Sequence, residues 1–69
     1  MKKDEITRAI EEMDCLNRTE VGAMTNLIFE AIEEGTEEKI DKAAAVIEWL
    51  HKTDRITLNN YMDMRDLIF

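Results

Sequence analysis

Apolar residues recur at three- and four-residue steps along most of this chain, which is the spacing of one face of an α-helix. The chain has no Pro and only two Gly, so few positions oppose helix formation. The pattern divides into four amphipathic segments with stop signals between them. We therefore expect an all-α fold: a compact antiparallel bundle of four helices, three longer and one short at the C-terminus, in a single domain over residues 1–69.

The first two expected helices span residues 5–15 and 18–34. Asp4 is the expected N-cap of the first helix, because its side chain can accept a hydrogen bond from the first turn. Asn17 followed by Glu20 three residues later has the spacing of a capping box at the start of the second helix. The apolar arc of the second helix is wide, so we expect it to contact several neighbours and to be the central helix. This arc comprises Val21, Met24, Leu27, Ile28, Phe29, Ala31 and Ile32.

The third expected helix follows the second almost at once. Gly35 is expected to end the second helix, since Gly adopts the left-handed conformation without strain, and Thr36 is the expected N-cap of the third. Trp49 falls on the opposite side of this helix from Ile40, away from its apolar face. That face comprises Ile40, Ala43, Ala44, Val46, Ile47 and Leu50.

The fourth expected helix begins after its N-cap, Thr57. We expect Arg65 to lie within its apolar face, with the aliphatic stem packed and the guanidinium reaching an acid such as Asp66 or Glu48. Leu67 falls outside this face on the helical wheel. The expected face comprises Leu58, Tyr61, Met62, Ile68 and Phe69.

The chain carries a formal charge of −7, and this charge is unevenly distributed. Residues 1–38 hold 4 bases and 11 acids, whereas residues 39–69 hold 5 of each. The densest acidic stretch is interrupted only by Lys39 and comprises Glu30, Glu33, Glu34, Glu37, Glu38 and Asp41. Two interpretations remain open: a solvated face that keeps a small protein soluble, or a surface that docks on a basic partner.

Trp49 is the only Trp in the chain, and it lies off the expected core. Either the fourth helix or the N-terminus folds over it, or it belongs to a partner or dimer surface together with Ala45 and Leu67. A domain of this size has a small core, so burial between two copies would add to its stability. We therefore expect a homodimer.

The residues that could act in catalysis or bind a metal do not match a known catalytic or metal-binding arrangement. Cys15 is far in sequence from the only His, so no activated nucleophile is expected. Glu48 and His51 have the Glu-x-x-His spacing of di-iron bundles, but that spacing is common by chance, and no cofactor or metal is expected. The negative charge argues against direct contact with nucleic acid, and no apolar run is long enough to span a membrane.

These observations favour a non-enzymatic, acidic, helical protein-interaction module, a regulator or inhibitor that binds a protein partner. The expected site residues are those of the acidic stretch together with Trp49. The alternative is an acidic nucleic-acid mimic, a phage-type inhibitor that blocks the basic groove of a DNA- or RNA-handling protein. A metal-binding bundle that uses Glu48 and His51 is a minor alternative. The unpaired Cys15 fits a reducing compartment, so a cytoplasmic location is expected.

Overall fold

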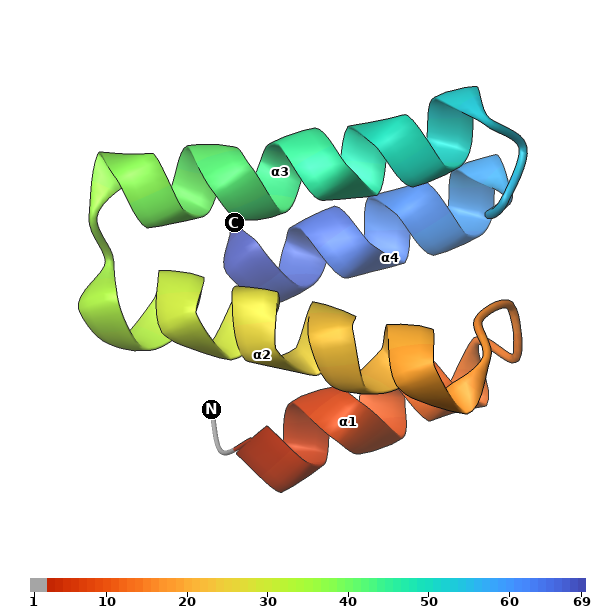
Figure 1. Ribbon diagram of the computed structural model, residues 1–69, viewed down its shortest axis with the longest axis horizontal. Helices are drawn as coiled ribbons and strands as arrows, with labels where there is room; N and C mark the ends of the chain where they lie inside the picture. Colours follow the sequence, from red (N-terminus) through yellow and green to blue (C-terminus); the bar gives the residue numbers. More distant parts are fainter. Residues whose placement is uncertain (1–2) are drawn as a thin grey trace.

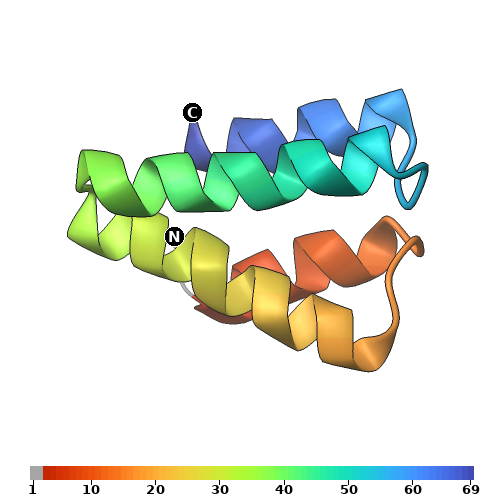
Figure 2. The ribbon, with the colours of Figure 1, turned by 45° about the horizontal axis from the view of Figure 1, so that its top comes forward.

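The computed structural model describes residues 3–69, and these residues form four α-helices and no strand. The helices are α1 (Lys3–Glu12), α2 (Arg18–Glu34), α3 (Glu37–Lys52) and α4 (Leu58–Ile68) (Figure 1). Successive helices run in opposite directions, so the expected all-α antiparallel bundle of four helices is confirmed. The expected lengths differ, because α1 and α4 are both short, with 10 and 11 residues, and α2 and α3 are the longer helices, with 17 and 16. Two helical hairpins, α1–α2 and α3–α4, lie one on the other (Figure 2).

Helix α2 is the central element of the bundle, as its wide apolar arc predicts. It packs against α1, α3 and α4, whereas α1 packs mainly against α2. The buried cluster between the helices draws on all four of them and on the α3–α4 loop. It comprises Ile6, Ile10, Val21, Met24, Ile28, Ile47, Leu50, Ile56 and Met64.

The predicted helix boundaries around α2, α3 and α4 are confirmed by the geometry of the caps. The Asn17 side chain accepts a hydrogen bond from the Glu20 N–H at 2.8 Å, and the Asn17 N–H donates to Glu20 Oε1 at 3.0 Å. Gly35 adopts a left-handed φ of 61° at the end of α2. Thr36 and Thr57 cap α3 and α4 through their side-chain oxygens. Each of these boundaries depends on residues close in sequence, which is why the sequence predicts them.

The predicted boundaries of α1 are wrong at both ends. The helix already includes Lys3 and Asp4, so Asp4 belongs to the first turn and is not the N-cap. An acid is favoured at both places, as a cap or by the helix dipole, so its presence alone does not separate them. At the other end, α1 stops at Glu12, and Asp14 adopts a left-handed φ of 50° that turns the chain toward α2. Cys15 therefore lies in the loop.

The predicted apolar face of α4 is largely wrong. Met64, which was not included in it, is fully buried, while Leu58, Met62 and Phe69 are exposed. Apolar residues surround much of α4, so contacts with α2 and α3 decide which side is buried, not the local pattern. The half-buried residues that pack against the core from α4 are Tyr61, Leu67 and Ile68.

None of the helices in residues 3–69 combines the length and the hydropathy that crossing a bilayer requires.

Candidate functional site

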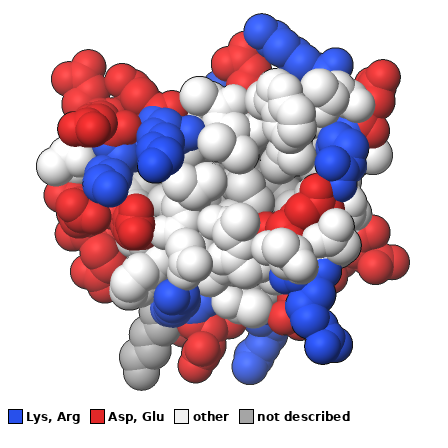
Figure 3. All heavy atoms as spheres, viewed as in Figure 1, with Lys and Arg blue, Asp and Glu red and all other residues white. Residues whose placement is uncertain are grey.

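The densest negative charge lies where α2 leads into α3. We name this region the acidic turn and define it as Glu30, Glu33, Glu34, Glu37, Glu38 and Asp41. In Figure 3 acidic side chains gather at the left end of the molecule, where Figure 1 places this turn. Glu30 is half-buried, and the other five residues are exposed. The left-handed Gly35 brings the two helix ends together, so charges from both helices meet at one end of the bundle.

The acidic turn places charges at helix ends of opposite polarity. Glu37 and Glu38 lie in the first turn of α3, where the positive end of the helix dipole favours them. Glu33 and Glu34 lie in the last turn of α2, which contains no base, and there the dipole opposes them. Helix stability alone therefore does not account for the acids at the end of α2, although they strengthen the negative potential of this surface.

Lys39 lies close to the carboxylates of the acidic turn. Its Nζ lies 3.4 Å from Glu30 Oε2, and a hydrogen bond joins the two groups. That hydrogen bond and the charge of Glu30, followed by the charges of Glu34 and Glu38, raise the pKa of Lys39 above its usual value. The carboxylates therefore act together on the ammonium group of Lys39, which in turn offsets part of their negative charge.

Trp49 lies far from the acidic turn, toward the other end of α3. Twelve residues separate it from Glu37, which is about 18 Å along a helix. Its side chain is 57% exposed, so α4 does not bury it. Beside Trp49 is a shallow hollow of about 270 Å³ that Ala45, Glu48 and Lys52 also line. The predicted site residues thus form two separate surfaces.

Leu67 does not belong to the Trp49 surface. It packs against the core and lines a second hollow together with Ala9 and Glu12 of α1. The expectation that Leu67 joins Trp49 and Ala45 in one surface is therefore wrong, because α4 turns Leu67 toward α1.

The residues considered for a metal have other partners in the structure. Glu48 forms an ion pair with Lys52 at 3.4 Å, and the His51 ring stacks on Tyr61 with 4.8 Å between the ring centroids. Within residues 3–69, no three His, Cys, Asp or Glu side chains are grouped in a way that could hold an ion.

Cys15 is poorly suited to act as a nucleophile. Burial is the main cause that raises the pKa of its thiol, and the charges of Asp14 and Glu20 add to the effect. A raised pKa reduces the fraction of thiolate at neutral pH, and the thiolate is the reactive form. This environment is typical of a thiol that packs against the core, as Cys15 does.

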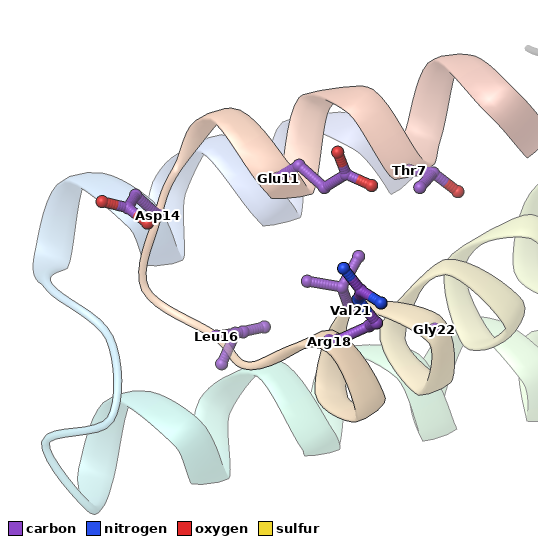
Figure 4. A pocket seen from close by; sticks show the side chains of 7 residues that line it. All are labelled: Thr7, Glu11, Asp14, Leu16, Arg18, Val21 and Gly22. Atoms are coloured by element: carbon purple, nitrogen blue, oxygen red, sulfur yellow. The ribbon is translucent and has the colours of Figure 1, made fainter.

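A pocket of about 470 Å³ lies between α1 and α2 (Figure 4). Glu11 from α1 and Arg18 from α2 point into this space from opposite sides, while Asp14 points away from it. Its charges are therefore mixed and do not converge on one point. The sequence did not predict this pocket, because it exists only where α1 pairs with α2. Its lining comprises Thr7, Glu11, Asp14, Leu16, Arg18, Val21 and Gly22.

The structural class is thus an all-α bundle of four helices with one acidic end and exposed apolar residues on α3 and α4. Comparison of the chain with models of protein families, with curated proteins and with solved structures gives no match.

Proposed function

We propose that this protein is a non-enzymatic interaction module, a cytoplasmic regulator or inhibitor that binds a protein partner with a basic surface through the acidic turn. The observation that carries the proposal is the environment of Lys39. Glu30 first, through its hydrogen bond and its charge, and then Glu34 and Glu38 raise the pKa of Lys39, although partial burial of its side chain acts in the opposite direction. A partner's Lys or Arg could reach these carboxylates directly, because five of the six are exposed.

Electrostatic attraction of this kind acts mainly on the rate of association and on the choice of partner. An acidic end on a molecule that is otherwise close to neutral would orient the approach of a basic surface. The half of the chain that follows residue 38 has balanced charges, so it would not compete for the same partner. The environments of Cys15 and His51 support a role without catalysis, because burial and two nearby carboxylates raise the pKa of the Cys15 thiol and the His51 ring stacks on Tyr61.

The alternative, a mimic of nucleic acid, draws on the charge of α1. Asp4, Glu5, Glu11 and Glu12 are exposed on this helix and extend the negative surface beyond the acidic turn. A mimic would occupy the basic groove of its target and would therefore be displaced by DNA or RNA. A regulator that binds outside such a groove would not.

The test compares partners captured from the native cell by the wild-type protein and by a variant with Glu33, Glu34, Glu37 and Glu38 changed to Gln. Mass spectrometry identifies and quantifies the captured proteins. We expect a basic protein that the wild type retains and the variant loses. Its affinity should fall steeply between about 50 and about 500 mM salt, because screening weakens contacts between exposed charges.

The matched control changes the four exposed acids of α1, Asp4, Glu5, Glu11 and Glu12, to their amides, so that the net charge changes by the same amount. Equal loss of binding in both variants would show that overall charge, and not the acidic turn, attracts the partner. Binding that neither variant changes would contradict the proposal. Displacement of the captured protein by a DNA or RNA duplex would favour the mimic.

A further inference from the structure

The four-helix bundle is open between α1 and α4. Within residues 3–69, α1 packs on α2, and α4 packs on α2 and α3, but α1 and α4 make little contact with each other. The two helices run in opposite directions, so the end of α1 lies near the start of α4 (Figure 1). A hollow of about 420 Å³ lies between them there, and we name it the α1–α4 groove. Its lining comprises Ala9, Glu12, Met13, Asn60, Asp63 and Leu67.

The floor of the α1–α4 groove is apolar. Met13 and Leu67 are half-buried and pack against the core of the bundle, and Ala9 is half-buried as well. Each keeps part of its surface exposed, and an apolar side chain placed on this floor would remove that surface from water. Asn60 and Leu67 are about 10 Å apart along α4, so the floor is long enough for about two turns of another helix.

Both sides of the α1–α4 groove carry a carboxylate. Glu12 of α1 and Asp63 of α4 are exposed, and the ion pairs among residues 3–69 include neither of them. None of the six described residues that line the groove is a base. The bases nearest in sequence, Arg8 and Arg65, are exposed outside this lining. An apolar floor between two anionic sides is complementary to an apolar side chain with cations beside it.

We propose that the α1–α4 groove binds a basic amphipathic helix of another protein. Such a helix places apolar side chains three and four residues apart on one face, and these would lie on the floor formed by Ala9, Met13 and Leu67. Lys or Arg residues beside that face would pair with Glu12 and Asp63. A helix also satisfies its own backbone hydrogen bonds, whereas an extended segment would find no strand to pair with in residues 3–69.

The charges of the groove favour this partner over a second copy of the chain. In a symmetric contact the groove would face itself, and the carboxylates of Glu12 and Asp63 would meet those of the other copy. Like charges placed together in an interface oppose association. A basic helix instead meets opposite charge on both sides of the groove.

The α1–α4 groove is distant from the acidic turn. Helix α1 ends and α4 begins at one end of the bundle, and the turn from α2 to α3 is at the other (Figure 1). The two surfaces share no residue, so the inference goes beyond the proposed function and does not depend on it. A protein bound in the groove would be lost when the acids of α1 are changed to amides and kept when the acidic turn is changed.

The first test titrates the purified protein with a synthetic peptide of about 15 residues, near the shortest length at which an isolated helix forms in water. The peptide has Leu at steps of three and four and Lys at the positions beside them. NMR spectra of the backbone amides give both the affinity and the place of binding. We expect a Kd between about 10 µM and about 1 mM, as for a small interface, and shifts in residues 9–13 and 60–67.

Two control peptides separate the groove from charge alone. One has the same composition in scrambled order, and it should bind at least about fivefold more weakly because its Leu residues no longer share one face. The other has Glu in place of each Lys and should not bind, because the sides of the groove repel it.

The second test compares two variants that change the net charge equally. Glu12→Gln combined with Asp63→Asn should weaken binding of the Leu–Lys peptide about fivefold, since two ion pairs between exposed groups are lost. Glu33→Gln combined with Glu34→Gln, in the acidic turn, should change the affinity by less than about twofold. Circular dichroism confirms that each variant is folded.

A third comparison tests the floor without changing the charge. Ala9→Met fills part of the groove and should weaken binding of the Leu–Lys peptide, whereas Ala23→Met, at an exposed position of α2, should leave it unchanged. An equal effect of these two variants would overturn the proposal.

Four further results would also overturn it. The first is no amide shift at about 1 mM peptide, above the expected Kd. The second is equal binding of the scrambled peptide, which would show that charge alone attracts it. The third is a set of shifts confined to residues 30–41, which would place the peptide on the acidic turn. The fourth is a shift of the groove residues when the free protein is concentrated, which would show that a second copy occupies the groove.

Discussion

Met62 and Met64 are two positions apart on α4 and have opposite environments. Met64 is fully buried among residues of the other helices, whereas Met62 is more than half exposed. The same side chain therefore contributes to the core at one position and to an exposed surface at the other.

Substitution of each Met by Ala should change the free energy of unfolding by different amounts at the two positions. Met64→Ala should lower the free energy of unfolding by about 2–4 kcal/mol, because it removes buried methylene groups and leaves a cavity. Met62→Ala should change it by less than about 0.5 kcal/mol, as expected for an exposed position. Urea denaturation of both variants and of the wild type measures these values. Equal destabilisation by the two variants would show that α4 packs in a different rotation.

The environment of Met64 could not be predicted from the sequence. Two overlapping apolar faces exist on α4, one that contains Leu58 and Met62 and one that contains Met64 and Leu67. Local periodicity does not choose between them, because the choice depends on contacts with α2 and α3. The sequence also did not predict that Arg65 would bond the Tyr61 hydroxyl and not an acid. The acidic turn, by contrast, was predictable, because its charges are close in sequence and helix ends are readily located.

At the scale of the helix, boundaries are predictable where a cap is formed by neighbouring residues. Asn17, Gly35, Thr36 and Thr57 each act as predicted, because a cap involves only a few consecutive residues. The end of α1 differs, since its last turn is determined by how Asp14 turns the chain to let α1 pack on α2. Prediction therefore succeeded at these four caps, where the determinant was local, and failed at the end of α1, where it was tertiary.

The two Gly residues of the chain should respond in opposite ways to substitution by Ala. Gly22 is inside α2, and a Cβ at this position would meet no atom within 4 Å, so Gly22→Ala should stabilise the protein by about 0.5–1 kcal/mol. Gly35 has a φ of 61°, where a Cβ is strained, so Gly35→Ala should destabilise it by about 1–2 kcal/mol. Thermal and urea denaturation of both variants check these values. A stabilising Gly35→Ala would contradict the left-handed end of α2.

At the scale of the whole molecule, Glu20 joins the two helical hairpins. It belongs to the capping box of α2, and its carboxylate also pairs with Arg55 in the loop between α3 and α4. The hydrogen bond from the Asn17 N–H is the main cause that lowers the pKa of Glu20, and Arg55 lowers it further. The ionised carboxylate therefore links the start of α2 to a loop that lies 35 residues away.

The pH dependence of stability should reflect this link. Because the pKa of Glu20 is lower in the folded protein than its ordinary value of 4.5, its contribution to stability is complete above that pH. The contribution disappears as the pH falls through the lowered pKa of the folded state. Glu20→Gln should therefore be less stable than the wild type at neutral pH, and the difference should shrink on acidification. Urea denaturation across this pH range measures both proteins.

Arg55→Ala is the matched comparison for Glu20→Gln. It keeps the capping box and removes only the ion pair, so its effect at neutral pH should be the smaller of the two. If Arg55→Ala lowers the free energy of unfolding more than Glu20→Gln does, the ion pair, and not the cap, makes the larger contribution to stability.

The order of the helices in space follows their order in the chain. Helix α1 packs on α2, α2 on α3 and α3 on α4, with short turns between them. Contacts between helices that follow one another in the chain close only short loops, so their entropic cost is small. Helical proteins of this kind fold in microseconds to milliseconds. Synthesis at about 5–20 residues per second takes several seconds for a chain of this length. Contacts between α1 and α2 can thus form many times over while α3 and α4 are still being synthesised.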